Sequence, residues 1–138
     1  MVAKGFLQKY GVDFTDVYAL EARLEIVRLV VVVASWRNWQ ICQLDVKSTF
    51  LNGPLGEEVY VRQLPGFEVK GEEMKVYRLR KALYGLRQAP WAWNKLIGSF
   101  LCEQGFVKSK VEFGVYVKKD SHRRSLIVCL YVDDLIVT

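Results

Sequence analysis

Apolar and polar positions along the chain follow two different periods, which predict a mixture of helices and strands. Between residues 21 and 36, apolar side chains recur at helical spacing, at Leu24, Val27, Val31 and Ala34. This pattern is typical of a helix with one buried face. The four consecutive valines in the same segment are more typical of strands. We nevertheless expect a helix here.

A second helix is predicted from Pro90 onward. Proline suits the first turn of a helix, and Gly105 can end the helix in a left-handed conformation. The apolar stripe of this segment is expected to pack in the core rather than to bind a cofactor. It consists of Trp93, Leu96, Ile97, Phe100 and Leu101.

Period-two alternation and turn residues predict the strands. In the first predicted strand, Cys42, Leu44 and Val46 fall on one face, and Asp45 falls on the more polar face. Asn52-Gly53-Pro54 and Leu64-Pro65-Gly66 are predicted to break the chain. The predicted strands cover residues 39–46, 58–62, 76–79, 113–118 and 125–132.

Two adjacent carboxylates follow the last of these strands. Asp133 and Asp134 stand between the apolar runs 126–132 and 135–137, which predicts the tip of a tight β-hairpin. Two interpretations remain open at this point. The acids either shape the turn alone, or they supply oxygen ligands to a hard divalent cation such as Mg²⁺.

Composition favours one compact domain, because 138 residues with 51% hydrophobic and 25% charged side chains match ordinary globular proteins. No signal peptide is visible, and the longest apolar stretch, residues 29–35, is too short to cross a bilayer. Three widely spaced cysteines are expected to be reduced, buried thiols of an intracellular protein that is not secreted. A single histidine, His122, argues against a conventional zinc site.

The net charge of +5 is unevenly distributed. Residues 1–73 carry a net charge of −2 and residues 74–138 a net charge of +7, and no acid lies between Glu73 and Glu103. Aromatic side chains are interspersed in this basic stretch, a mixture suited to phosphates and stacked bases. The alternative is an ordinary solvated basic face. Its cations are Lys75, Arg78, Arg80, Lys81, Arg87 and Lys95.

Several sequence blocks resemble the polymerase of Ty1/copia retrotransposons, a group of reverse transcriptases. They occur in the family's order across essentially the whole chain, and the resemblance rests on the series rather than on any one block. The blocks are VAKGF at residues 2–6, LDVKSTFLNG at 44–53, EVYV at 58–61, PGF at 65–67, LYGLRQAP at 83–90, GVYV at 114–117 and YVDD at 131–134.

The resemblance implies an α+β fold in which a palm-like antiparallel sheet packs on helices. Residues 1–138 would form a single partial domain, with truncated fingers and no thumb. The resemblance also implies that Asp45, Asp133 and Asp134 hold two Mg²⁺ ions, with Mn²⁺ as a substitute and the carbonyl of Val46 as a further ligand. Such a pair of ions activates the primer 3′-hydroxyl and stabilises the leaving pyrophosphate.

The resemblance also assigns roles in binding the substrates. Phe50 falls where the family places an aromatic wall against the incoming sugar, which would exclude a 2′-hydroxyl; a core phenylalanine is the alternative. Tyr84, Gly85 and Gln88 match the region that lines the nucleotide pocket. Arg87 would contact template phosphate. The expected nucleic-acid-binding residues are Lys75, Arg78, Arg80, Lys81 and Arg87.

Departures from the family pattern leave two functions open. The chain begins inside the VAKGF block, ends four residues after Asp134, has Leu20-Glu21 in place of Pro-Val and has Trp91 in place of Arg, which suggests a truncated or decaying copy. The first hypothesis is a fragment of an RNA-directed DNA polymerase. It would act on an RNA template, a DNA primer and deoxynucleotides, in a cytoplasmic particle or the nucleus and without a membrane. Integrase, thumb and ribonuclease H would lie elsewhere in the parent polyprotein. The alternative is a non-catalytic remnant that acts as a basic nucleic-acid-binding or interaction module.

Overall fold

The computed structural model describes residues 2–19, 21–119 and 125–138. In these parts of the chain, two α-helices accompany seven strands and two short 3₁₀ helices. Their order is η1 (Gly5–Leu7), α1 (Leu24–Trp36), β1 (Cys42–Asp45), η2 (Thr49–Asn52), β2 (Pro54–Arg62), β3 (Val76–Lys81), α2 (Ala89–Glu103), β4 (Val107–Lys108), β5 (Val115–Lys119), β6 (Ser125–Tyr131) and β7 (Asp134–Val137).

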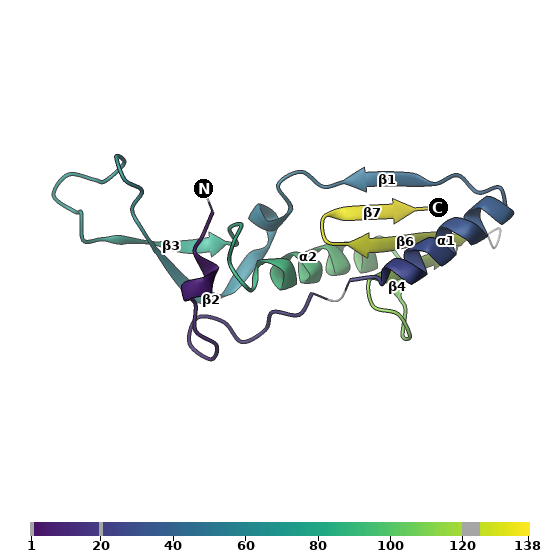
Figure 1. Cartoon of the computed structure of the whole chain (residues 1–138), viewed down its shortest axis with the longest axis horizontal. Helices are drawn as coiled ribbons and strands as arrows, with labels where there is room; N and C mark the ends of the chain where they lie inside the picture. Colours follow the sequence, from purple (N-terminus) through teal and green to yellow (C-terminus); the bar gives the residue numbers. More distant parts are fainter. Residues whose placement is uncertain (1, 20, 120–124) are drawn as a thin grey trace.

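The strands form two antiparallel sheets, which confirms the mixed α+β class. One sheet has five strands in the order β1-β7-β6-β5-β4, and the other pairs β2 with β3. Figure 1 shows the two-stranded ribbon extending at one end of an elongated molecule, with the five-stranded sheet and α1 at the other end. The helix α2 runs from the base of the ribbon beneath the sheet.

The two helices cover opposite faces of the five-stranded sheet. On one face, α2 packs Trp93, Ile97 and Leu101 against alternate residues of β5, β6 and β7, among them Tyr116 and Leu130. The intervening residues of the same strands, such as Val115 and Cys129, pack against α1. The period-two alternation seen in the sequence therefore separates two cores rather than a core and a solvent face.

The start of α1 is fixed by contacts outside the helix. It begins at Leu24, three residues later than predicted, because the preceding segment is extended and bonds to the sheet. The amide of Ala22 donates to the Leu130 carbonyl at 2.9 Å. The amide of Arg23 donates to the Glu112 carboxylate at 3.1 Å, and the Arg23 guanidinium binds the same carboxylate. These contacts lower the pKa of Glu112, chiefly through the hydrogen bonds from the Arg23 side chain.

Several other expectations are corrected by the structure. The helix α1 buries Val30 and Ala34, whereas Leu24 and Val31 of the predicted stripe are exposed. On α2, Leu96 and Phe100 are likewise exposed, because the sheet contacts only the narrower stripe that contains Trp93, Ile97 and Leu101. The strand β1 is shorter than predicted, β2 is longer, and β4 was not predicted.

The remaining expectations concern cysteines, membranes and the single histidine. All three cysteines are free, but only Cys129 is buried, because Cys42 lies on the edge strand β1 and Cys102 near the exposed end of α2. None of the helices in the described ranges is long and apolar enough to cross a membrane. His122 lies outside the described residues.

Candidate active site

The backbone brings the three predicted aspartates to one end of the five-stranded sheet. In the pairing of β1 with β7, Asp45 lies directly opposite Asp134, although 88 residues separate them in the sequence. Directly opposed residues of antiparallel strands point to the same face of the sheet. The amide of Val46 donates to the Asp133 carbonyl at 3.1 Å, so the hairpin tip is attached to the end of β1.

The hairpin tip is a tight turn of Val132 and Asp133 between the paired residues Tyr131 and Asp134. Val132 has a φ of 54°, which is a rare conformation for a β-branched residue. The indole nitrogen of Trp93, on α2, donates to the Val132 carbonyl at 2.9 Å. The turn is therefore held by a hydrogen bond from each side, one from Val46, just after β1, and one from α2.

The carboxylates have few hydrogen bonds that would compete with a cation. Asp45 is exposed, and Asp133 and Asp134 are partly exposed. Gln43 donates from its amide nitrogen to Oδ1 of Asp134 at 3.2 Å. In the described parts of the chain, no three His, Cys, Asp or Glu side chains are gathered as a group that could hold a metal ion. The aspartates are thus neighbours on the backbone, with side chains that do not converge.

The carbonyl of Val46 is already a hydrogen-bond acceptor. The buried hydroxyl of Thr49, in η2, donates to it. A carbonyl oxygen has two lone pairs, so one remains for a cation. The atoms available as metal ligands are all oxygens, which is the chemistry that Mg²⁺ requires. The donor chemistry of these residues therefore suits Mg²⁺, although the three aspartate side chains are not gathered around one point in the described parts of the chain.

An aromatic pair lies near the hairpin tip, because Phe50 lines the same crevice as Val132. Phe50, in η2, contacts Tyr84, with ring centroids 5.0 Å apart and an interplanar angle of 57°. η2 can approach α2 closely because Gly53 follows it: a Cβ at Gly53 would lie 3.0 Å from the backbone of Ala92 and Trp93. Phe50 is only partly buried and packs against the core, as the core alternative expects. Its role as a wall against the sugar stays a prediction.

The loop that follows Tyr84 is packed against the N-terminal segment. The amide of Ala3 donates to the Tyr84 carbonyl at 2.7 Å. Gly85 has a φ of +92°, and a Cβ there would collide with the carbonyl of Ala3, so both conformation and space require glycine. Tyr84 and Gly85 therefore lie in a loop held by residues 2–8, and their place in a nucleotide pocket stays a prediction.

Gln88 and Arg87 are engaged within the protein. Gln88 is fully buried, accepts a hydrogen bond from the Gln8 amide at 3.0 Å and donates to the Asp13 carbonyl at 3.1 Å. The guanidinium of Arg87 donates to the Gly5 carbonyl at 3.0 Å and lies over the Phe14 ring. Both side chains connect the N-terminal segment to the loop before α2.

A further carboxylate, Glu21, lies near Asp133. It lines a narrow crevice together with Phe50, Trp93 and Val132. Burial raises the pKa of Glu21, and the negative charge of Asp133 raises it further. Glu21 thus adds negative potential to the hairpin tip.

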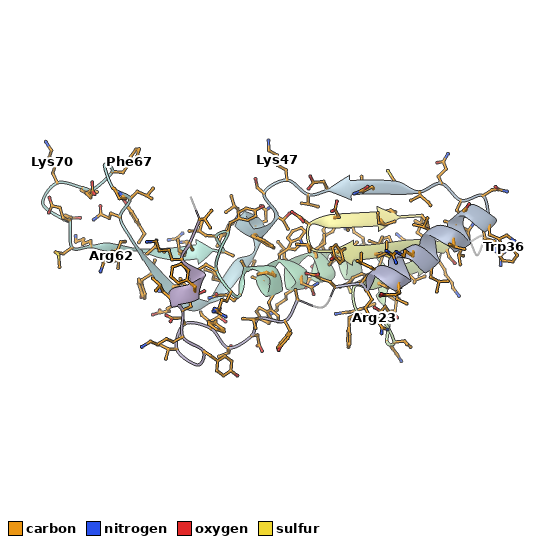
Figure 2. The ribbon with its side chains drawn as sticks, viewed as in Figure 1. Arg23, Trp36, Lys47, Arg62, Phe67 and Lys70 are labelled. Carbon is orange, nitrogen blue, oxygen red and sulfur yellow. The ribbon has the colours of Figure 1, made fainter. Side chains whose placement is uncertain are left out.

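The basic residues predicted to bind nucleic acid are mostly on the β2–β3 ribbon, and two of them form ion pairs. Lys75 pairs with Glu72, and Arg78 pairs with Glu58 at 2.9 Å. Arg80 and Lys81, at the end of β3, have no such partner in the described parts of the chain. Figure 2 shows three further exposed side chains, Arg62, Phe67 and Lys70, toward the far end of the ribbon.

Comparisons with known proteins show the family to which the chain belongs. A family model described as reverse transcriptase (RNA-dependent DNA polymerase) matches residues 1–138. The chain belongs to the reverse transcriptase family. Like the chain's own sequence blocks, its relatives place the chain in the Ty1/copia group of retrotransposon polyproteins.

Three relatives illustrate the match. The Retrovirus-related Pol polyprotein from transposon RE2 of Arabidopsis thaliana is 42% identical over 139 residues, covering 100% of this chain and 9% of the relative. That from transposon TNT 1-94 of Nicotiana tabacum is 39% identical over 137 residues, covering 99% and 10%. The Transposon Ty1-NL2 Gag-Pol polyprotein of Saccharomyces cerevisiae is 38% identical over 100 residues, covering 72% and 5%.

The chain therefore spans about a tenth of the length of its plant relatives. In length, it therefore corresponds to a small part of such a retrotransposon polyprotein. No solved structure matches it.

Two residues near the hairpin tip had no functional interpretation in the sequence. Trp93 was predicted as core, and it is 5% exposed, but its indole nitrogen also bonds to the turn. Glu21 was noticed only as a departure from the family pattern. The proximity of Glu21 to Asp133 depends on an extended segment crossing the sheet, for which the sequence contains no periodic signal.

Proposed function

We propose that this reverse transcriptase fragment carries the palm of an RNA-directed DNA polymerase, in which Asp45, Asp133 and Asp134 hold two Mg²⁺ ions. The observation that carries the proposal is the strand register that sets Asp45 directly opposite Asp134, next to Asp133 in the turn. The family match supports it independently.

In this proposal each residue at the hairpin tip has a distinct task. When bound, the two ions would supply activation of the primer 3′-hydroxyl and stabilisation of the leaving pyrophosphate. Asp45 and Asp133 would contact the ions from adjacent backbone segments, and Asp134 would complete the ligand set. The amide of Gln43 orients Asp134 through its bond to Oδ1. The free lone pair of the Val46 carbonyl offers one further oxygen.

The aromatic pair would bind the incoming deoxynucleotide. Phe50 and Tyr84 form one tilted wall, and Phe50 would exclude a 2′-hydroxyl by occupying its space. Gly85 would let the backbone of this loop remain close to the N-terminal segment. Because Gln88 is buried and bonded on both sides, we propose that it shapes the pocket without contacting the nucleotide.

Primer and template would contact the basic end of the ribbon. Arg80 and Lys81 are the strongest candidates for phosphate contacts, because no ion pair in the described structure neutralises them. Lys75 and Arg78 would first have to leave Glu72 and Glu58. Arg87 would act through the loop that it fixes, since its guanidinium is bonded to Gly5.

Mn²⁺ binding to the isolated chain tests the metal site. Mn²⁺ is a spectroscopically visible substitute for Mg²⁺, and electron paramagnetic resonance measures its free concentration. Asp45→Asn and Asp133→Asn are each expected to weaken binding at least about tenfold, since each removes one charged ligand, a loss of about 1.4 kcal/mol or more. Asp16→Asn, at an exposed position outside the site, is the matched control. Equal affinities in all four proteins would refute the proposal.

The salt dependence of primer–template binding helps to distinguish the catalytic from the non-catalytic alternative. Binding to a primer–template should weaken steeply as salt rises, and Arg80→Gln with Lys81→Gln should reduce the slope of log K against log salt by about 1.4–1.8. Lys110→Gln is the control in an exposed loop. Salt-sensitive binding without any aspartate-dependent Mn²⁺ binding would favour the non-catalytic binding module instead.

A further inference from the structure

We propose that Trp93 is a positioning residue for the carboxylates. Its indole N–H holds the Val132 carbonyl and so maintains the turn conformation from which Asp133 and Asp134 reach a divalent cation. This role rests on the proposed function, because it concerns the same cation site.

The turn needs an external restraint. Val132 occupies the left-handed region, with a φ of 54°, at a turn position where glycine is the usual residue. A β-branched residue remains in this conformation only when its surroundings fix it. Without restraints, the turn would populate other conformations that displace the following Asp133.

The structure supplies restraints on two successive carbonyls of the turn. Trp93 Nε1 lies 2.9 Å from the Val132 oxygen, and the Val46 amide nitrogen lies 3.1 Å from the Asp133 oxygen. The second bond comes from Val46, which directly follows Asp45 at the end of β1. The first comes from α2, whose core packing fixes the Trp93 ring against Leu130 and Leu135.

The hydrogen bond is separable from the packing of the ring. Trp93 is 5% exposed and belongs to the main core cluster, so an aromatic replacement can fill most of its space. Phenylalanine has no N–H, however, and would leave the Val132 carbonyl without this donor. Loss of a buried hydrogen-bond donor of this kind shifts the equilibrium between this turn conformation and the alternatives by about threefold to tenfold. Only the competent turn binds the cation, so the apparent affinity falls by up to this factor, and it approaches the full factor because Val132 without the donor favours other turn conformations.

The test compares Trp93→Phe with Trp91→Phe by Mn²⁺ titration of the 138-residue chain. Trp91 lies two residues earlier on α2, and its ring contacts the ammonium group of Lys95 rather than the turn. We expect Trp93→Phe to bind Mn²⁺ about threefold to tenfold more weakly than the unmodified chain, and Trp91→Phe to bind equally well. Circular dichroism identifies a temperature at which all three proteins are fully folded. A purely structural role for Trp93 would then leave the affinity unchanged, and that result would overturn the proposal.

Failure of the proposed function would look different. It would appear as Mn²⁺ binding that Asp133→Asn does not change, before any tryptophan variant is considered, and the positioning role would fall with it. If Trp93→Phe does not fold, nuclear magnetic resonance of the unmodified chain provides the second measurement. The indole N–H of Trp93 should exchange with solvent at least about a hundredfold more slowly than that of the exposed Trp36, as expected for a buried hydrogen-bonded group. Equal exchange rates would show that the bond does not form and would overturn the proposal.

Discussion

Replacing Gly53 by alanine should press η2, and with it Phe50, away from α2. A Cβ at this position would lie 3.0 Å from the carbonyl carbon of Ala92 and from the amide nitrogen of Trp93, and 3.1 Å from the Ala92 Cβ. Backbone atoms of a packed helix cannot yield as a flexible side chain can. Gly53 has a φ of −67°, which alanine adopts without strain, so the expected effect comes from packing alone.

Gly56→Ala is the matched control. Gly56 lies three residues later, and a Cβ there would meet nothing within 4 Å. Both substitutions restrict the unfolded chain, a gain in stability of about 0.4–1 kcal/mol that is common to the two variants. Overpacking costs about 1–3 kcal/mol and applies to Gly53→Ala only. The difference between the two variants therefore isolates the packing cost.

Urea denaturation followed by circular dichroism measures this difference. With a denaturant slope of about 2 kcal/mol per molar, the midpoint of Gly53→Ala should lie about 0.5–1.5 M below that of Gly56→Ala. Coincident midpoints would refute the close packing of η2 on α2, and with it the account of how Phe50 is positioned.

Two further predictions concern titratable groups. Hydrogen bonds from Arg23 lower the pKa of Glu112, so the Glu112 carboxylate stabilises the fold above its unfolded pKa of about 4.3 and loses that contribution as pH falls through the folded pKa. Glu112→Gln should therefore make thermal stability less dependent on pH below about pH 4.5. An unchanged dependence would contradict the ion pair. Burial raises the pKa of Cys129 to about 11. Iodoacetamide at pH 8 should therefore label the two exposed cysteines and leave Cys129 unlabelled in the folded chain, which mass spectrometry of peptides measures. Rapid labelling of Cys129 would place it outside the core.

Local patterns in the sequence were sufficient to predict the elements that carry the aspartates. Alternating residues predicted the strand containing Asp45, and two acids between apolar runs predicted a hairpin tip at Asp133 and Asp134. The turn lies one residue earlier, at Val132 and Asp133, and Asp134 begins β7. The pairing that sets Asp45 opposite Asp134 joins segments far apart in the chain. Register of this kind depends on the tertiary fold, and only the family resemblance anticipated that these residues belong together.

The contacts of the basic side chains and of Gln88 were harder to predict from the sequence. A run of basic residues indicates charge but not whether each cation has a partner, and the structure pairs Arg78 with Glu58 across the ribbon. Gln88 was expected to face the nucleotide, but its burial between Gln8 and Asp13 depends on how the N-terminal segment folds back. Such contacts between non-periodic segments have no sequence signature.

The central claim is that the aspartates of this fragment support nucleotidyl transfer. The most direct test replaces the matching segment of the tobacco TNT 1-94 polyprotein with residues 1–138 and measures Mg²⁺-dependent addition of one deoxynucleotide to a DNA primer on an RNA template. Loss of a metal ligand should cost several kcal/mol of transition-state stabilisation, so Asp133→Asn in the chimera should slow addition by more than about 100-fold. Addition at the same rate with and without Asp133→Asn would contradict the account.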